Sequence, residues 1–417
     1  SLYIMDRIDL FDLYSYNPVA SSERHIDDIV DFKLYNNLYN ELESIILNIN
    51  RDIFESFFKE DYNYGGKELR VLSPQLPFNL FLASLTLQDI IKSHPKNLFK
   101  ITVYQDQLNI DFRYANLYAI IARNIKDRFS IIHSNKQFPV YFNDPQSDNK
   151  LLSALNFNLK FIFGEKFEKF FSIISKKKIL SIGRNYISRE IESELLFKRI
   201  ATIKIKNKLL DSMEFITADE SISSEHYLDI NKIVEFNLKR IKEQHFTDLS
   251  VYNSFVIELS KYAASLVVNM LNNKNFARNK VKEFKKQITN NVCIGNGLFS
   301  KDGKIIYDAL KFNNIYFFSC SHGLTVGNSM DSKNNFYSDE SLTSDTFFCY
   351  NQAAKSTRSA NINNKMKIII VGGNDVSKKI RFKFIQKQIL KNRLKMSGPI
   401  IFYVSHNIQL NVGKYFP

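Results

Sequence analysis

Cysteine, glycine, proline and tryptophan are all scarce in this chain of 417 residues, which contains 3, 13, 8 and 0 of them. The three cysteines, Cys293, Cys320 and Cys349, include no CxxC pair, so we expect neither a zinc ribbon nor a disulfide framework. The sequence also has no P-loop, HExxH, GxSxG or DxD motif. These absences argue against P-loop NTPases, zinc peptidases, α/β-hydrolases and transferases that clamp a diphosphate through a metal ion.

Long apolar runs are also missing. The residues from Ser1 to Arg7 carry charge where a signal peptide has an apolar run, and no uninterrupted apolar stretch of about 18 residues is present. We therefore expect a cytoplasmic protein. If it contacts a membrane, we expect a peripheral contact at the cytoplasmic face of the inner membrane.

Positive charge is in excess, with 57 Lys and Arg against 43 Asp and Glu and a net charge of +14. This balance favours anionic partners, which include nucleic acid, phosphorylated small molecules and an acidic membrane surface, and it does not choose among them. Because 44% of the residues are hydrophobic, the chain is able to bury real cores.

Helix-like and strand-like segments alternate along the chain, which indicates an α/β fold with mainly parallel sheets. The expected helices are 31–59, 79–93, 109–125, 151–174, 188–199, 230–244, 249–290, 304–312 and 377–395. The expected strands are 69–72, 100–104, 129–133, 140–142, 178–183, 201–205, 292–294, 315–320, 347–350, 368–371 and 399–404. Strand signals are almost absent from 228–290. We therefore predict an α/β domain at 1–227, a helical connection at 228–290 and a second α/β domain at 291–417.

Small and polar residues follow three strands of the second predicted domain, at the strand ends where open α/β sheets usually bind ligands. They are Ser321, His322, Gly323 and Gly327 after 315–320, Gly372, Gly373 and Asn374 after 368–371, and Ser405, His406 and Asn407 after 399–404. Glycines let backbone N–H groups approach an anion, and a histidine can donate to a phosphate or move a proton near neutral pH. A turn histidine and ordinary helix capping are the alternative explanations.

Two acidic groups are candidates for catalysis. One contains Asp219 and Glu220, and the other contains Asp339, Glu340 and Asp345. A carboxylate in a cleft between domains can serve as a general base or as a nucleophile. Solvated surface carboxylates are far commoner, so this assignment depends on where the fold places them.

The order of these motifs resembles the carboxyl-terminal domain of bacterial surface-polysaccharide glycosyltransferases of the GT-B type. The resemblance covers 291–417 and rests on Gly295-Asn296-Gly297, Ser321-His322-Gly323, the second acidic group, Gly372–Asn374 and Tyr403–Ser405. It implies two Rossmann-like domains that face a cleft and are joined by the helical segment. Similar His-Gly loops occur in glycerophosphotransferases that build teichoic acids. The β-Kdo transferases, which use CMP-Kdo, are one candidate branch.

The resemblance further implies a metal-independent transferase that has a nucleotide sugar, with CMP-Kdo as one candidate, as its co-substrate and needs no other cofactor. The loops from Ser321 to Gly327, Gly372 to Asn374 and Ser405 to Asn407 would hold the donor, with His322 at its phosphate. Asp219 or Glu220 would act on the acceptor, a saccharide or lipid-linked saccharide of a surface polysaccharide such as LPS O-antigen or capsule. The family pattern also implies a further loop and an acidic residue beyond Pro417.

Two alternatives from other classes stay open. A glycerophosphotransferase of the teichoic-acid type has a similar His-Gly loop, and a basic nucleic-acid-binding protein without catalysis agrees with the charge. Against nucleic acid as a partner, no helix-turn-helix, zinc finger or RNP-type aromatic motif is legible, and the basic residues are dispersed.

Overall fold

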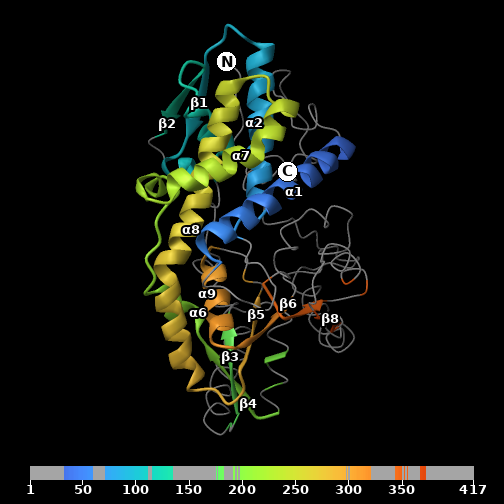
Figure 1. The fold of residues 1–417 in the computed structure, drawn as a ribbon, viewed down its shortest axis with the longest axis vertical. Coiled ribbons are helices and arrows are strands. Elements are labelled where there is room, and N and C mark those ends of the chain that lie inside the picture. Colours follow the sequence, from blue (N-terminus) through green and yellow to red (C-terminus); the bar gives the residue numbers. More distant parts are fainter. Residues whose placement is uncertain are drawn as a thin grey trace, which may run out of the picture.

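The protein is an α/β fold with parallel sheets and several helices, seen in a computed structural model (Figure 1). The structure describes residues 32–59, 71–110, 115–134, 175, 177–182, 191–192, 195, 198–296, 298, 301–320, 343–349, 352, 355 and 367–371. Its helices are α1 (Phe32–Phe57), α2 (Gln75–Ser93), α3 (Leu117–Ala122), α6 (Lys206–Leu210), α7 (Tyr227–His245), α8 (Leu249–Lys285) and α9 (Lys301–Phe312), with 3-10 turns η3 (Gln105–Leu108) and η4 (Glu220–Ser223). Its strands are β1 (Phe99–Val103), β2 (Phe129–His133), β3 (Lys177–Ile182), β4 (Ile200–Lys204), β5 (Val292–Asn296), β6 (Tyr316–Cys320), β7 (Thr346–Cys349) and β8 (Lys367–Ile370).

Local signals explain where several helices begin. The Asp248 carboxylate accepts hydrogen bonds from the backbone N–H groups of Ser250 and Val251, and so caps α8. The Asn116 side chain caps α3 in the same way through Ala119 N–H. The predicted helix at 109–125 is therefore confirmed only as the shorter α3. The predictions at 31–59 and 129–133 match α1 and β2 closely.

The predicted strand at 69–72 is wrong for the two of its residues that the structure describes, Val71 and Leu72, which are not in a strand. The Asn50 side chain of α1 donates to the Leu72 carbonyl at 2.9 Å and accepts from the Leu72 N–H at 2.6 Å. A side-chain amide thus bonds the same two backbone groups that a neighbouring strand would bond. Apolar character identified these residues as buried, but it did not identify the partner of their backbone.

The six-stranded sheet has the strand order β4-β3-β5-β6-β7-β8, and all its pairs are parallel. The chain moves outward in one direction from β3 to β4, and in the other direction from β5 to β8. The order therefore reverses between β3 and β5. A separate two-stranded parallel sheet pairs β1 with β2.

The two faces of the six-stranded sheet pack against different parts of the chain. Leu180 and Cys293 belong to the main core cluster, which also contains side chains of α8 and α9. On the other face, Ile179 and Ile294 form a second cluster with Ile191, which lies between β3 and β4 in the sequence. Right-handed crossovers that run in opposite directions along a sheet lie on opposite faces, which explains this division.

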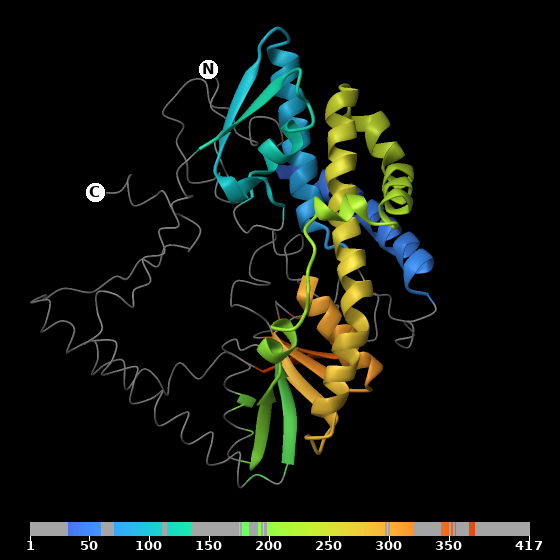
Figure 2. The same ribbon diagram turned by 90° about the vertical axis from the view of Figure 1, so that its left-hand side faces the viewer.

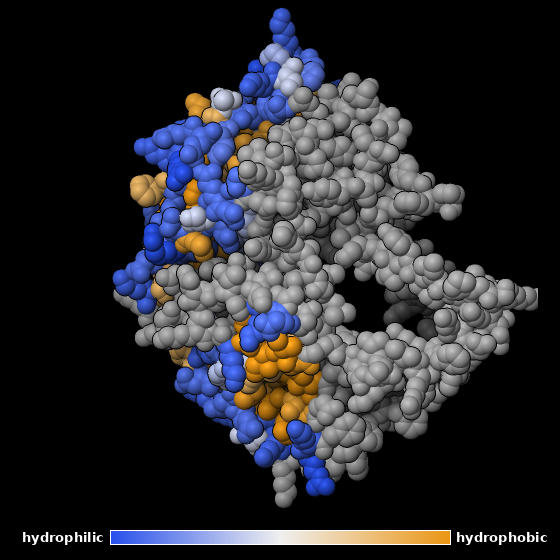
Figure 3. Space-filling view, turned by 90° about the vertical axis from the view of Figure 1, so that its right-hand side faces the viewer, coloured by the Kyte–Doolittle hydropathy of each residue, from blue (hydrophilic) through white to orange (hydrophobic). Residues whose placement is uncertain are grey.

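An apolar patch marks the part of the molecule that holds the six-stranded sheet (Figure 3). Two exposed apolar side chains near its last described strand are Ile370 and Val371, each 41% exposed. The rings of Phe318 and Phe348 stack on neighbouring strands with their centroids 5.5 Å apart. Aromatic stacking across neighbouring strands stabilises this outer half of the sheet.

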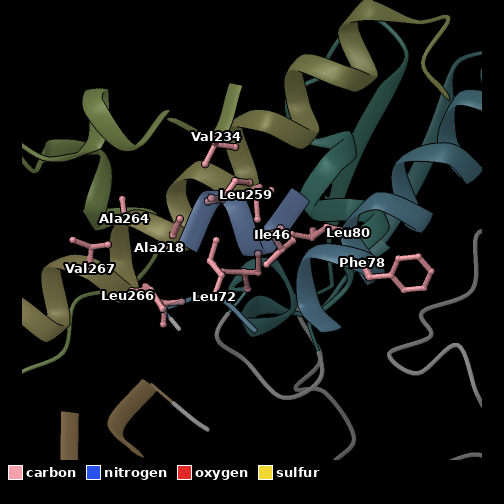
Figure 4. Packing of buried hydrophobic residues seen from close by; sticks show 14 of the residues in the cluster. Ile46, Leu72, Phe78, Leu80, Ala218, Val234, Leu259, Ala264, Leu266 and Val267 are labelled. Carbon is pink, nitrogen blue, oxygen red and sulfur yellow. The ribbon is translucent and has the colours of Figure 1, made fainter. Parts of the chain in front are cut away.

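The main core joins α1, α2, α7 and α8. Figure 4 shows Ile46 of α1, Leu80 of α2, Val234 of α7 and Leu259 of α8 converging, with Leu72 beside them. All these side chains are fully buried. Removal of apolar surface from water, at about 25 cal/mol per Å², is the main force that holds these helices together.

Helix α8 is the longest element and spans about 55 Å at 1.5 Å per residue. It extends alongside both the helices around α7 and the six-stranded sheet (Figure 2). By length and composition it is the one candidate membrane span among the described residues, but 83% of its most apolar window is buried inside the protein. Buried core helices meet the same criteria of length and apolar composition. These criteria therefore do not distinguish a core helix from a membrane span.

The pairing of β3 with β5 crosses the boundaries predicted between 1–227 and 291–417. Strands β3 and β4 were expected in the amino-terminal domain, yet they share a sheet with β5 to β8. Strand pairing is set by contacts far apart in sequence, so the alternation of local patterns did not reveal it. The predicted elements at 140–142, 151–174, 377–395 and 399–404 lie outside the described residues.

Candidate functional site

The candidate site lies at the carboxyl edge of the six-stranded sheet, where the strand order reverses between β3 and β5. In open α/β sheets, ligands bind outside the carboxyl ends of the strands at such a reversal. The register pairs Ile182 of β3 with Gly295 of β5, and Asn296 of β5 with Cys320 of β6. Three neighbouring strands therefore end together at this edge.

Gly295 lets the backbones of β3 and β5 approach closely at this edge. A Cβ atom at this position would lie 1.9 Å from the Ile182 carbonyl oxygen, far inside any real contact distance. The clash is with backbone, so no rotation of a side chain relieves it. Only glycine is compatible with this pairing, and the reversal point is built from main chain.

Polar groups gather on one face of the sheet near this edge. The Asn296 Oδ1 atom is buried, and the part of the chain that the structure describes supplies no hydrogen-bond partner for it. The Ser181 hydroxyl of β3 donates to the Glu192 carboxylate, and both residues are buried. Because side chains alternate along a strand, Ser181, Ile294 and Asn296 share the face that carries the second cluster. This face is apolar over most of its area and becomes polar at the reversal point.

The donor residues expected from sequence lie beyond the ends of β6 and β8 and fall outside the described residues. They are His322, Ser321, Gly323, Gly327, Gly372, Gly373, Asn374, Ser405, His406 and Asn407. The structure shows where the strands that precede two of these loops lie. Strand β6 ends at Cys320 and β8 at Ile370, at the same edge of the sheet as β5.

Asp219 belongs to a partly buried charge network between α3, η4 and α8. Its two oxygens accept hydrogen bonds from the Arg123 guanidinium at 2.8 and 3.0 Å. Arg123 also donates to both oxygens of Glu258, at 2.6 and 3.1 Å. Lys261 Nζ lies 2.9 Å from Glu258 Oε1 and 3.3 Å from Asp219 Oδ1. We call Arg123, Asp219, Glu258 and Lys261 the four-charge network, which has no net charge.

Exposure differs sharply within the four-charge network. The Glu258 side chain is fully buried, whereas the Asp219 side chain is 52% exposed. Partial burial opposes ionisation of Asp219, but hydrogen bonds and charge from Arg123 and Lys261 outweigh it and lower the pKa of Asp219. A carboxylate with a lowered pKa and both oxygens engaged is a poor general base. The geometry therefore argues against proton abstraction by Asp219.

Glu220 is the first residue of the short η4 helix, and its side chain reaches back to Thr217. Its Oε2 atom accepts from the Thr217 N–H at 2.6 Å and from the Thr217 hydroxyl at 3.0 Å, while Thr217 Oγ1 accepts from the Glu220 N–H. This reciprocal arrangement is a capping box. The Thr217 hydrogen bonds, aided by the Lys301 charge, lower the pKa of Glu220. Lys301 is the first residue of α9, the helix that follows β5 in the sequence, so Glu220 is close enough to the start of α9 to interact with that charge.

Residues 214–224, which we call the strap, are bound along α8 and to the start of α9. The Asn269 side chain pairs with both the N–H and the carbonyl of Ile216. The Asn273 side chain donates to the Glu214 carbonyl at 2.7 Å, and Lys301 Nζ donates to the Ile216 carbonyl at 2.7 Å. These bonds fix the strap, and Asp219 and Glu220 with it, relative to α8 and α9.

Asp345, from the second acidic group, has a structural role at the opposite edge of the sheet. Its carboxylate accepts from Lys311 Nζ at 2.7 Å and from the Phe317 N–H at 2.8 Å. These contacts join α9, β6 and β7 at the amino-terminal ends of the two strands. Asp339 and Glu340 lie outside the described residues.

Sequence reasoning missed Arg123, Glu258, Lys261 and the role of Asn296. Glu258 and Lys261 are charged residues in the most apolar helix of the chain, and this contrast was the available signal. Asn296 was visible within Gly295-Asn296-Gly297, but that motif entered the resemblance only through its place in the order of motifs. In the structure, glycine is required at position 295 because β3 and β5 approach each other closely there.

Among the described residues, no group of three or more His, Cys, Asp or Glu side chains is placed to hold a metal ion. The fold and this edge define an α/β protein with parallel sheets and a reversal of strand order at the candidate site. No family model, curated protein or solved structure matches the chain.

The lowered pKa of Asp219 predicts an acid-dependent loss of stability. A carboxylate whose pKa is lower in the folded state stabilises the fold above its unfolded pKa and loses that contribution as the pH falls through the folded value. We expect Asp219→Asn to be less stable than wild type at pH 6 and to show a smaller further loss below about pH 4. Urea unfolding at pH 6 and pH 3 measures both.

A matched control is Asp229→Asn on the exposed side of α7, where Asp229 pairs with Lys232 at 3.0 Å. An exposed ion pair of this kind contributes at most about 1 kcal/mol, so we expect little change at pH 6. Wild-type and Asp219→Asn stabilities that differ by the same amount at both pH values would contradict the assignment.

Proposed function

We propose that this chain is a metal-independent glycosyltransferase that moves a sugar from a nucleotide-sugar donor to a growing bacterial surface polysaccharide. The donor, with CMP-Kdo as one candidate, binds at the carboxyl edge of the six-stranded sheet. The acceptor is a saccharide or a lipid-linked saccharide, and the two lobes of a GT-B-like arrangement face each other across it. The absence of a DxD motif from the sequence supports metal independence.

One observation carries the proposal. Strands β5, β6, β7 and β8 are consecutive parallel neighbours, so β5, β6 and β8 all end at one edge. The residues that follow them in sequence are Gly297, then Ser321-His322-Gly323, then Gly372-Gly373-Asn374. Glycine- and histidine-containing loops that leave one sheet edge together supply several hydrogen-bond donors to one anion.

The proposed reaction needs a stabilised leaving group and an activated acceptor. As the bond between the anomeric carbon and the phosphate breaks, negative charge develops on the departing nucleotide. Backbone N–H groups and His322 donate to that charge, and such preorganised donors are typically the largest catalytic contribution. Glu220 on the strap takes the proton of the acceptor hydroxyl. Glu220 is the better candidate for this step because both oxygens of Asp219 are held by Arg123.

The excess of positive charge supports an acceptor that is carried on an anionic membrane surface. Juxtamembrane basic residues gain about 1 kcal/mol each near such a surface. Peripheral contact with the inner membrane therefore belongs to the proposal.

The first test is thermal stabilisation by nucleotides. A ligand at 100 times its Kd stabilises the folded state by about 2.7 kcal/mol, which raises the Tm by a few degrees. We expect CMP, CDP or UDP at low millimolar concentration to raise the Tm. A Tm that no nucleotide or nucleotide sugar changes would remove the proposal. Affinity for nucleic acid that falls steeply with salt would favour the alternative class.

The same measurement tests His322. We expect His322→Ala to lose nucleotide stabilisation and to lower kcat of sugar transfer by about 100-fold, the usual effect of removing one donor to a developing charge. The control is His133→Ala, at the exposed end of β2 in the other sheet, which we expect to behave as wild type. Wild-type transfer and affinity in His322→Ala would exclude His322 from the site.

A further inference from the structure

At the reversal point between β3 and β5, a polar side-chain atom is buried without a hydrogen-bond partner among the described residues. Asn296 is the last residue of β5, and its Oδ1 atom is buried without a hydrogen-bond partner among the described residues. Buried polar atoms in native proteins are almost always bonded, so an exception of this kind needs a reason.

Asparagines that are fully buried among the described residues have hydrogen-bond partners. Asn50 bonds both backbone groups of Leu72, and Asn269 bonds both backbone groups of Ile216. Asn313 donates to the carbonyls of Arg278 and Ala309. The Gln107 Nε2 atom is also buried without a partner among the described residues, so Asn296 differs from these asparagines, though not from every buried amide, and what sets it apart is its place at the sheet edge.

Asn296 lies at the sheet edge where its strand and the neighbouring strand both end. Gly295, the residue before it, brings the backbones of β3 and β5 so close that no side chain fits between them. Asn296 pairs in register with Cys320, the last residue of β6 before Ser321 and His322. The unsatisfied oxygen therefore lies at the point where ligands bind in open α/β sheets, one strand away from the start of the His322 loop.

We propose that Asn296 Oδ1 accepts a hydrogen bond from the nucleoside part of the nucleotide donor, through a hydroxyl or an amino group. This inference rests on the proposed function and adds an orientation to it. An amide oxygen only accepts hydrogen bonds, and an ionised phosphate oxygen also only accepts, so the two do not pair. The nucleoside of the donor lies over β5 at Asn296.

The test compares Asn296→Ala with Asn50→Ala in the full-length chain. If Asn296 Oδ1 awaits a ligand, its removal costs the free protein nothing, and we expect an unchanged or higher Tm. Asn50→Ala leaves the Leu72 N–H and carbonyl unpaired, so we expect its Tm to fall. The Kd for the best nucleotide of the panel should rise about tenfold in Asn296→Ala, which corresponds to one lost hydrogen bond. The Kd in Asn50→Ala should stay at the wild-type value.

Inorganic pyrophosphate serves as a second probe because it lacks a nucleoside. We expect its Kd to be the same for wild type and Asn296→Ala. A Tm that falls in Asn296→Ala as far as in Asn50→Ala, or a nucleotide Kd that does not change, would overturn the inference while the proposed function stands. Equal loss of nucleotide and pyrophosphate binding would also overturn it. A wild-type protein that binds no nucleotide would instead overturn the proposed function itself.

Discussion

Glu258→Ala should destabilise the protein by about 3 kcal/mol or more, the cost of leaving a buried charge without its partner. Glu258 is fully buried and accepts hydrogen bonds from Arg123, Lys261 and Asn124. Its loss leaves two cations facing each other with only the half-exposed Asp219 between them. Urea unfolding followed by circular dichroism measures the free energy of unfolding.

The matched control lies on the same helix. Glu283 pairs with Lys280 at 2.8 Å on the surface of α8, and its side chain is 60% exposed. We expect Glu283→Ala to change stability by less than about 1 kcal/mol, because an exposed pair at this spacing contributes little. Glu258→Gln should lie between the two, because it keeps the size of the side chain and loses the charge. Equal stabilities for Glu258→Ala and Glu283→Ala would show that the four-charge network does not hold the fold.

Gly295→Ala should disrupt the sheet at its reversal point. The added Cβ would lie 1.9 Å from the Ile182 carbonyl oxygen, so β3 and β5 must separate at their carboxyl ends. Overpacking of a well-packed interior usually costs about 1–3 kcal/mol, and a clash with backbone belongs at the upper end of that range. We expect a lower Tm and, since the edge is deformed, loss of stabilisation by nucleotides.

Ile294→Val is the control for Gly295→Ala, since it alters the adjacent residue of β5 by removing one buried methylene. Such a change typically costs about 0.5–1.5 kcal/mol and leaves the backbone in place. We expect Ile294→Val to keep its response to nucleotides. A Gly295→Ala protein with wild-type Tm and nucleotide response would mean that β3 and β5 do not approach as described.

Local patterns predicted many of the helices and strands because the spacing of apolar residues within a short stretch of sequence differs between a helix and a strand. The apolar spacing in 31–59 predicted α1, and the strand-like pattern of 129–133 predicted β2. The predicted helix at 249–290 ends earlier, at Lys285, where the basic residues of the last turn reach the end of α8. An α/β fold with parallel sheets follows from the alternation of these elements, and the structure confirms it at that level.

Features that depend on residues far apart in the chain were not predictable in the same way. Arg123 and Glu258 are 135 positions apart, and Asn50 and Leu72 are 22 apart. No local sequence pattern indicates that β3 pairs with β5 and not with β1 or β2. The candidate donor loops could be proposed because each directly follows a strand. The unsatisfied Asn296 oxygen became visible only once neighbouring strands were in register.

The six-stranded sheet is interrupted in sequence, since β3 and β4 are followed by the strap, α7 and α8 before β5 appears. During synthesis on the ribosome, β3 and β4 therefore emerge well before the strand that pairs with β3 on its other side. At about 5–20 residues per second, this delay lasts for seconds. An unpaired edge with apolar side chains is prone to intermolecular pairing for that time. We therefore expect nascent chains of this protein to need early folding of the long α8 helix, or a chaperone, before β5 pairs with β3 and completes the sheet.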